Sequence, residues 1–492
     1  MTKANRLSSE RQRKRLTRRT FLKGAAVGGA GMWAASALPR RAFMDDPHRP
    51  PKLYEYFVDN FWFETVGLYD EEINPPLKGR QPADIAILGG GFAGMSAAYN
   101  LQRRFPGKRI VLLEGACCGY GASGRNGGFA DVGMPGLGFV YESAGPEAAR
   151  AYYDATALGM DQIRTFVGAH GVDCDFEMNG ATMMATEERH LEDLAGTKAR
   201  FDSMGIEVEL LDKAAVRERV SSERFVGGLR EPHHAILNPA KLARGMKRVI
   251  ESMGVVVSER SKVMRVEPGT PVRIVTEFAE VRADQAVIAL NGYAPQIGFF
   301  RNRVIPLCNY VAATEPLSDA QLASIGWAGR ECLSDQRVQF MYLRLTADNR
   351  IVFGGESAPY FYDSSPSSGN YQPSLDKLQR SLLTTFPQLE GVRFTHGWGG
   401  TMGFTMDFVP SVGALGDSGN LFYAVAFNGE GVVMTQLAGQ ILAQLMAGDE
   451  SDLTRLPLVN KSMPYVGHEP LRYAAVKLYE RALHMFSGNP LQ

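Results

Sequence analysis

Glycine and acidic residues in the stretch 84–114 are spaced as a dinucleotide-binding site requires. Gly89, Gly91 and Gly94 fit the pattern G-x-G-x-x-G, and Glu114 ends the stretch. The first glycine of this pattern permits a tight turn, the second lets the backbone approach a pyrophosphate, and the third lets helix and strand pack closely. The N–H groups at the start of the helix can bind phosphate, and the acidic side chain can accept hydrogen bonds from ribose hydroxyls.

The elements around these residues follow in the order that such a site needs. The apolar run 85–88 predicts a buried strand, and Met95, Ala98 and Leu101 recur at helical spacing. A second predicted strand, 109–113, places the acidic residue at its end. We therefore predict a βαβ unit that binds an adenine dinucleotide; a glycine turn inside an unliganded βαβ unit is the alternative.

A second glycine-rich stretch follows at 119–129, with five glycines in its first ten residues. Ser123, Arg125 and Asn126 lie among these glycines and can donate hydrogen bonds. The pattern predicts a loop that wraps closely around a ligand with its backbone N–H groups turned inward. A flexible linker is the alternative, and the embedded Arg and Asn argue against it.

Length and composition limit the possible functions. A chain of 492 residues predicts two domains or interleaved lobes. Its zero net charge is uneven: residues 1–23 hold nine Lys or Arg and one acidic residue, so the rest carries about −8. A mildly acidic body argues against nucleic acid as a partner. Five cysteines without a C-x-x-C motif predict neither a metal site nor structural disulfides.

The N-terminal segment resembles a twin-arginine export signal. Arg18 and Arg19 precede a weakly hydrophobic run, 24–38, with an A-x-A cleavage site at 35–37. This predicts a periplasmic or otherwise exported protein whose cofactor is loaded before export. An uncleaved membrane anchor and a disordered basic arm are the alternatives.

Proline-rich residues 38–82 read as a lead-in rather than a domain. This segment contains an aromatic cluster that we expect to pack across the body, with a partner or membrane surface as the alternative. The cluster consists of Tyr54, Tyr56, Phe57, Phe61, Trp62 and Phe63.

The sequence GASGRNGG at 121–128, the preceding LLE at 112–114 and the glycine-rich strand end before them resemble the D-amino-acid-oxidase family of FAD-dependent oxidoreductases. The similarity runs from about 54 to 475 and fits the branch that contains gamma-glutamylputrescine oxidase. It implies a mixed α/β (α+β) fold, in which a Rossmann-like FAD-binding domain is interleaved with an antiparallel-sheet substrate domain. FAD is expected to be noncovalent, because 396–407 lacks Cys and 119–129 lacks His.

The resemblance also implies roles for particular residues. Glu114 would bind the adenosine ribose, the backbone near Val263 would meet the adenine, and the glycine turn 429–431 would face the flavin pyrimidine at a helix N-terminus. The expected cofactor-binding residues are Gly89, Gly91, Gly94, Glu114, Ser123, Arg125, Asn126, Gly127, Gly128, Val263, Gly429 and Gly431.

The implied domains are discontinuous along the chain. They are a signal at 1–37, a lead-in at 38–82, an FAD-binding domain at 83–145, 236–299 and 396–450, a substrate domain at 146–235 and 300–395, and a tail at 451–492.

One departure from the family bears on the substrate. Members that oxidise amino acids often have W-x-G-x-R-P-x-T, in which Arg pairs with the substrate carboxylate; in register with Trp398 and Thr405, that Arg position holds Met402. Without this cation a buried carboxylate would be poorly compensated. We therefore expect an amine without an α-carboxylate, or an amino acid held by another residue such as Arg344.

The expected reaction is oxidation of a carbon–nitrogen bond. The amine carbon would transfer a hydride to flavin N5, and the resulting imine would hydrolyse. His396, Tyr342 and Arg344 are the candidate catalytic residues, although a structural role explains each equally well. Oxygen or quinone would accept the electrons.

Two other functions stay open. One is an exported amino-acid dehydrogenase that reduces quinone, and the other is a flavin-binding electron-transfer or sensor protein without amine turnover. Apolar residues at helical spacing over 471–485 could form a peripheral contact with a membrane or partner, or dock on the body itself.

Overall fold

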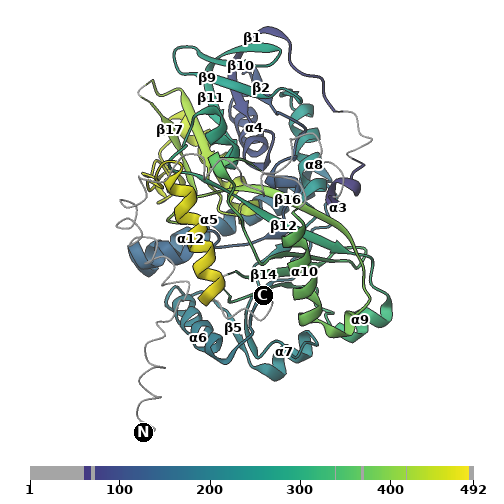
Figure 1. Cartoon of the computed structure of the whole chain (residues 1–492). Helices are drawn as coiled ribbons and strands as arrows, with labels where there is room; N and C mark the ends of the chain where they lie inside the picture. Colours follow the sequence, from purple (N-terminus) through teal and green to yellow (C-terminus); the bar gives the residue numbers. More distant parts are fainter. Residues whose placement is uncertain (1–59, 68–72, 338, 367–370, 417, 487–492) are drawn as a thin grey trace.

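A computed structural model describes residues 60–67, 73–337, 339–366, 371–416 and 418–486. The chain forms two lobes, each built on an eight-stranded sheet (Figure 1). The export signal and the aromatic residues Tyr54, Tyr56 and Phe57 lie outside the described residues.

The sheet of the first lobe carries the predicted dinucleotide motif. Strand β1 pairs in parallel with β2 along one edge and with β11 along the other, so it lies inside the sheet. Its last four residues, 85–88, are a continuous apolar and buried run, as is usual for strands of a parallel sheet. The strand order is β17 (Ser411–Leu415), β18 (Leu421–Val425), β11 (Ala279–Ile288), β1 (Gly79–Leu88), β2 (Ile110–Leu113) and β8 (Val256–Ser258), with β10 (Val272–Thr276) and β9 (Val263–Glu267) added to β11.

Helices α4, α5, α8 and α11 are the long helices that pack on the first lobe. Helix α8 (Pro239–Ser252) begins directly after Asn238, whose side-chain oxygen accepts hydrogen bonds from two backbone N–H groups. Helix α4 (Phe92–Arg104) lies against α11 (Val432–Ala447), and α11 also contacts α5 (Leu137–His170).

The sheet of the second lobe separates a core from a cavity. Residues such as Leu333, Leu343 and Phe353 point into a core on one face, whereas alternate residues such as Ser334 and Tyr342 line the cavity on the other. Its order is β16 (Phe394–Phe404), β12 (Ile305–Thr314), β15 (Ile351–Gly355), β14 (Met341–Leu345), β13 (Cys332–Asp335), β4 (Ala181–Ala185), β6 (Gly227–Glu231) and β5 (Glu209–Leu211).

Further elements complete the two lobes. A two-stranded ribbon is formed by β3 (Phe129–Ala130) and β7 (Ala235–Ile236). It follows the glycine-rich loop 119–129, which is called the cofactor loop below. The remaining helices are α3 (Phe61–Glu64), α6 (Glu188–Ser203), α7 (Lys213–Arg219), α9 (Asp319–Ile325), α10 (Gln372–Thr385) and α12 (Leu471–Phe486), and 3₁₀ turns span Ala122–Gly124, Asn291–Ile297, Tyr362–Ser364, Pro387–Leu389 and Leu453–Arg455.

The mixed α/β architecture predicted from the sequence is confirmed, and two contacts cross the domain boundaries that the sequence predicts. The stretch 394–404 pairs with β12 along its length, so it belongs to the second sheet rather than to the FAD-binding segment 396–450. Helix α5 packs against α11 of the first lobe, although the sequence places 146–235 in the substrate domain.

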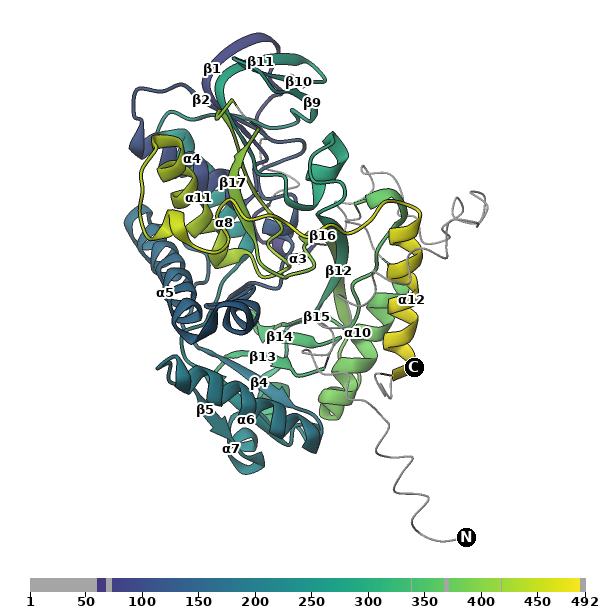
Figure 2. The ribbon, with the colours of Figure 1, turned by 90° about the vertical axis from the view of Figure 1, so that its left-hand side faces the viewer.

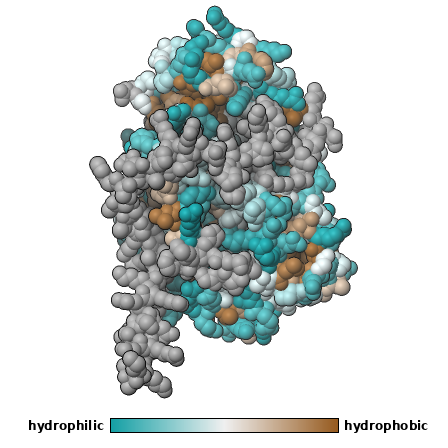
Figure 3. Space-filling view, viewed as in Figure 1, coloured by the Kyte–Doolittle hydropathy of each residue, from teal (hydrophilic) through white to brown (hydrophobic). Residues whose placement is uncertain are grey.

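Both ends of the described chain pack on the body. The side chains of Phe61, Trp62 and Phe63 are at most 6% exposed, as predicted for this part of the aromatic cluster. Helix α12 runs beside the second lobe (Figure 2) and lines the cavity with Tyr473, although Leu478 is 68% exposed. On the face shown in Figure 3, apolar residues form small separate patches. None of the helices in the described ranges is long and apolar enough to cross a membrane.

Candidate active site

A cavity of about 2910 Å³ runs between the two lobes. It begins at Gly89 and Gly91, where β1 passes into α4, and continues past the loop 120–127 to the open face of the second sheet. The predicted dinucleotide motif and the predicted substrate sheet therefore share one cavity.

The turn between β1 and α4 can be made only from glycine. A Cβ atom at Gly94 would lie 1.9 Å from the carbonyl oxygen of Gly89, and Gly89 itself has a φ of +111°. This close approach places the first turn of α4 at the end of the cavity.

Glu114 stands at the end of β2, in the position expected for a ribose ligand. Its two oxygens accept hydrogen bonds from the N–H groups of Gly90 (2.7 Å) and Ala116 (2.9 Å). Burial raises the pKa of Glu114, and these backbone donors oppose the rise. Glu114 and Val263 both line this end of the cavity.

The sequence predicts that the N–H groups of the glycine-rich loop turn inward to a ligand, but several of them form hydrogen bonds within the loop itself. The N–H groups of Gly124, Arg125 and Asn126 all donate to carbonyls within the loop, and that of Gly128 donates to the Asn126 side chain. Ser123 Oγ accepts from the N–H of Phe92 at 2.8 Å. These contacts set the shape of a loop that lines the cavity at Ser123, Arg125, Asn126 and Gly127.

The side chain of Arg125 is a structural cation. It is 2% exposed and donates from Nε to the carbonyl of Tyr120 (2.7 Å) and from Nη1 to that of Gly399 (3.2 Å). Its guanidinium also lies 5.0 Å from the ring centre of Phe63. Arg125 therefore joins the loop to β16 and to the N-terminal helix.

The turn before α11 forms the opposite wall. Gly429 has a φ of +87°, and Gly431 is the N-cap of α11. The side-chain oxygen of Asn428 accepts from the N–H of Thr405 at 2.8 Å, which ties the turn to the end of β16. Gly429, Glu430 and Gly431 all line the cavity.

Of the three predicted catalytic residues, Tyr342 alone lines the cavity. Its ring packs edge-to-face on Phe129 at 5.3 Å, and a Cβ at Gly127 would lie 2.7 Å from it. Burial raises the pKa of the Tyr342 hydroxyl well above its usual range, so the group stays protonated and can donate a hydrogen bond.

Arg344 is not placed as a substrate ligand. It is 1% exposed, and its Nη1 donates to the backbone carbonyls of Gly128 (3.0 Å) and Leu237 (2.6 Å). Burial lowers the pKa of Arg344 to about 10. Although Arg344 shares a strand face with Tyr342, the cofactor loop covers it, and this corrects the prediction.

His396 also lies away from the cavity lining, at the far end of β16. Its Nε2 is 2.7 Å from the carboxylate of Glu64, and its Nδ1 is 2.8 Å from the hydroxyl of Thr395. The prediction of a catalytic role for His396 is therefore corrected: it joins β16 to the N-terminal helix.

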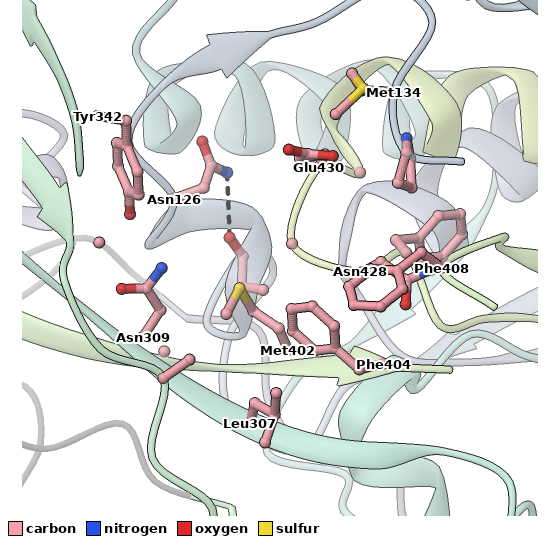
Figure 4. Close-up of a pocket in the computed structure, with 18 of the residues that line it drawn as sticks. Asn126, Met134, Leu307, Asn309, Tyr342, Met402, Phe404, Phe408, Asn428 and Glu430 are labelled. Carbon is pink, nitrogen blue, oxygen red and sulfur yellow. Dashed lines mark hydrogen bonds between the residues drawn. The ribbon is translucent and has the colours of Figure 1, made fainter. Parts of the chain in front are cut away.

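Several cavity residues were missed by sequence reasoning. One of them is Glu430. Figure 4 shows it around the same space as Asn126, Met402 and Tyr342, which were all named from the sequence. The rest of this wall is largely apolar and aromatic, formed by Met134, Leu307, Phe404 and Phe408, with Asn309 as a further amide. Glu430 offered no distinct signal, because an acidic residue just before the N-cap of a helix is ordinarily explained by its favourable interaction with the helix N-terminus.

A charged cluster occupies the cavity wall beside the β3–β7 ribbon. His234 Nδ1 lies at hydrogen-bond distance, 2.8 Å, from the carboxylate of Asp131. Its Nε2 lies 2.9 Å from the carboxylate of Glu231, close enough for an ion pair, but the two groups are not aligned for a hydrogen bond. Burial alone would lower the pKa of His234, but the two carboxylates raise it to about 10. The part of the chain that the structure describes contains no metal-binding group of three His, Cys, Asp or Glu. The five cysteines are free thiols.

Comparison with protein families now identifies the fold and its cofactor. Residues 84–445 match the family model DAO, described as FAD dependent oxidoreductase. The chain belongs to this family. The match runs through both lobes, which together line the cavity, and the family is one of FAD-dependent oxidoreductases.

Known relatives agree with this assignment. A probable oxidoreductase OrdL of Haemophilus influenzae is 30% identical over 411 residues, covering 82% of this chain and 91% of that protein. Gamma-glutamylputrescine oxidoreductase of Escherichia coli is 32% identical over 373 residues, covering 74% of this chain and 84% of that protein. Glycine oxidase of Geobacillus kaustophilus has the same fold, with a TM-score of 0.66 at 20% identity, covering 78% of this chain and all of that structure.

The residues of the cavity fit FAD. Glycines at the start of α4 leave the backbone open for a pyrophosphate, and the Glu114 carboxylate beside them can accept from ribose hydroxyls. The 429–431 turn places the start of a second helix at the cavity wall, where backbone N–H groups favour negative charge.

Proposed function

We propose that this protein oxidises a carbon–nitrogen bond of an amine, or of an N-substituted amino acid, with FAD as the electron acceptor. FAD, held by the residues that line the cavity from Gly89 to Gly431, would supply the redox chemistry as a hydride acceptor, and the imine product would hydrolyse in water. The observation that carries the proposal is the carboxylate of Glu430 in the cavity wall, flanked by two glycines expected to contact the flavin.

A carboxylate at this position favours a cationic substrate group. An ammonium beside Glu430 gains a charge-assisted hydrogen bond, and the rings of Tyr342, Phe404 and Phe408 offer faces that attract a cation. A substrate carboxylate in the same place would be repelled. Met402, at the position where amino-acid oxidising members often carry Arg, offers no positive charge.

The charge of the whole cavity supports an amine as well. Its lining contains eleven Asp or Glu and seven Lys or Arg. Three of these cations pair with acidic residues of the same lining, Arg189 with Glu187, Arg337 with Glu356 and Lys477 with Glu480, so acidic residues still exceed basic ones by eleven minus seven, or four. An acidic cavity raises the local concentration of cationic substrates.

The chain's own residues have three tasks in this proposal. Glu430 binds the ammonium and accepts a proton from it, because the amine must be neutral before its carbon can lose a hydride. Tyr342 positions the substrate with its hydroxyl. Met402, Phe404 and Phe408 exclude water from the reacting carbon and hold the C–H bond in place.

Anaerobic flavin reduction tests the proposal directly. Purified protein is mixed with polyamines, glutamylated polyamines and amino acids, and bleaching of the flavin absorbance is followed. Amines should bleach it, and Glu430→Gln should lower the second-order rate of bleaching roughly 10- to 100-fold while the flavin content stays unchanged. If only amino acids bleached the flavin, the result would favour the alternative function, an amino-acid dehydrogenase, over an amine oxidoreductase.

The same experiment also tests the sensor function and the choice of electron acceptor. A protein that no compound of the panel bleaches would be an electron-transfer or sensor flavoprotein. Release of hydrogen peroxide in air would indicate oxygen as the acceptor, whereas reduction of a soluble quinone without peroxide would indicate a dehydrogenase.

We also propose that the protein is exported by the twin-arginine route to the periplasm or beyond the cell. Support comes from Arg18 and Arg19 before a short apolar run. This route carries folded proteins, which suits an enzyme that must receive FAD first.

A further inference from the structure

Helix α3, a single turn at Phe61–Glu64, owes its position to what it packs against. One turn is too short to be stable alone, because nucleation is unfavourable. Asn60 caps the turn by accepting from the N–H of Trp62 at 2.9 Å, and the three aromatic side chains are buried. They are buried against Tyr120 of the glycine-rich loop together with residues of α8, β12, β15 and β16, among them Ala240 and Trp398.

Carbonyl oxygens of this loop are held from outside by side chains of three separate chain segments: the lead-in, β14 and β16. Each contact is a hydrogen bond to the main chain of residues 124–128. The pairs are Asn60 Nδ2 to Gly124 (3.3 Å), Trp62 Nε1 to Asn126 (2.9 Å), Trp398 Nε1 to Arg125 (2.8 Å) and Arg344 Nη1 to Gly128 (3.0 Å).

The donors also support one another. Trp62 and Trp398 pack edge-to-face at 6.4 Å, and the guanidinium of Arg344 lies 5.5 Å from the Trp62 ring centre. Thr65, just after α3, accepts a hydrogen bond from the N-cap Asn238 of α8 at 2.9 Å. Trp62 is therefore at the centre of the support behind the cofactor loop.

A loop with this much glycine needs such support. Five glycines in ten residues give the free chain many conformations, and a ligand that binds one of them bears the ordering cost. We propose that α3 is part of the FAD site: Asn60 and Trp62 hold the cofactor loop in its binding shape, so FAD binding and docking of the segment before β1 stabilise each other.

The proposal rests on the FAD of the family and not on the amine reaction, so a failure of the proposed function leaves it standing. Trp62→Phe keeps an aromatic ring but removes the indole donor to Asn126. It should raise the Kd for FAD about tenfold, measured by titrating FAD-free protein and following flavin fluorescence.

The matched control is Trp327→Phe in the second lobe. Trp327 is 3% exposed and its Nε1 donates to the carbonyl of Glu331 at 3.1 Å, so the same kind of bond is lost away from the loop. Trp327→Phe should lower the melting temperature and leave the Kd for FAD unchanged. Equal effects of the two variants on the Kd would mean that Trp62 is a general stability residue and would overturn the proposal.

Hydrogen exchange of the unmodified protein gives a second test that needs no variant. The N–H groups of Phe63, Glu64 and Thr65 donate to carbonyls at Asn60 and Phe61, so their exchange reports whether α3 is docked. Removal of FAD should speed their exchange at least tenfold. Unchanged exchange at these three positions would show that α3 docks independently of the cofactor.

Discussion

Arg344 and Gly128 are joined by a 3.0 Å hydrogen bond from a buried guanidinium to a backbone carbonyl. The same Nη1 atom also reaches the carbonyl of Leu237, the residue before the N-cap of α8. One side chain of the substrate sheet thus connects the cofactor loop with a helix of the FAD lobe.

Arg344→Met should therefore destabilise the protein and not act on the substrate. It takes a buried donor from the carbonyls of Leu237 and Gly128, and because the Gly128 carbonyl keeps the N–H of Leu237 as a donor, we expect a loss of about 1–3 kcal/mol in urea unfolding. Arg164→Met is the control, because the side chain of Arg164 is 66% exposed and should cost less than about 0.5 kcal/mol. A raised KM with unchanged stability would restore Arg344 as a substrate ligand.

Gly94→Ala should abolish FAD binding. The new Cβ would lie 1.9 Å from the carbonyl oxygen of Gly89, so α4 must move away from the turn, at a cost of about 1–3 kcal/mol or more. Flavin content of the purified variant measures the effect. Gly168→Ala in α5 is the control: its Cβ meets open space, and the variant should keep its flavin and gain about 0.5–1 kcal/mol.

Stability should fall as the pH rises from about 6.5 to about 10. His234 faces Asp131 and Glu231, and Tyr153 donates to Glu231. With a folded pKa of about 10 and an unfolded pKa near 6.5, the folded state binds more protons between these values. The stabilisation is thus complete below pH 6.5 and is lost as the pH approaches 10.

Urea unfolding at pH 6.5, 8 and 9.5 measures this loss. His234→Gln should be less stable than the parent protein at pH 6.5, and its unfolding free energy should change less between pH 6.5 and 9.5. Parallel pH profiles of the two proteins would show that His234 is uncharged when folded.

Met402→Arg should shift the substrate preference towards amino acids. The new guanidinium would lie in the cavity beside Leu307 and could pair with an α-carboxylate, which is worth roughly 10- to 100-fold in kcat/KM. Activity on simple amines should fall, because positive charge repels ammonium. Met402→Gln is the uncharged control, and a gain that it shares would point to polarity rather than to carboxylate pairing.

Replacement of Arg18 and Arg19 by Lys together should stop export. The variant should collect in the cytoplasm with its FAD bound, as measured by cell fractionation and flavin content. Arg13→Lys, outside the pair, should be exported normally. Normal export of the double variant would refute the twin-arginine assignment.

The parts of the fold that the sequence predicted well are local. The glycine turn and the apolar runs of β1 and α4 depend on residues within a few positions of one another, so their patterns report directly on structure. The family resemblance then supplied the interleaving of the lobes, which no local pattern contains.

The catalytic predictions were less successful for a physical reason. Alternation along β14 correctly places Tyr342 and Arg344 on one face, but it does not say what covers that face. Gly127 and Gly128, more than two hundred positions away, leave Tyr342 at the cavity and cover Arg344. His396 is bound by Glu64, again a contact between distant segments.

The packing of α4 on α11 has a consequence for the order of events during synthesis. Ser96 in α4 donates to the carbonyl of Gln436 in α11, a contact that spans 340 residues. At about 5–20 residues per second, a ribosome needs roughly 17 to 70 s between the two. The nucleotide-binding unit is therefore made early but stays exposed on one face until nearly the whole chain has emerged. Cofactor capture should be one of the last steps in the maturation of this protein.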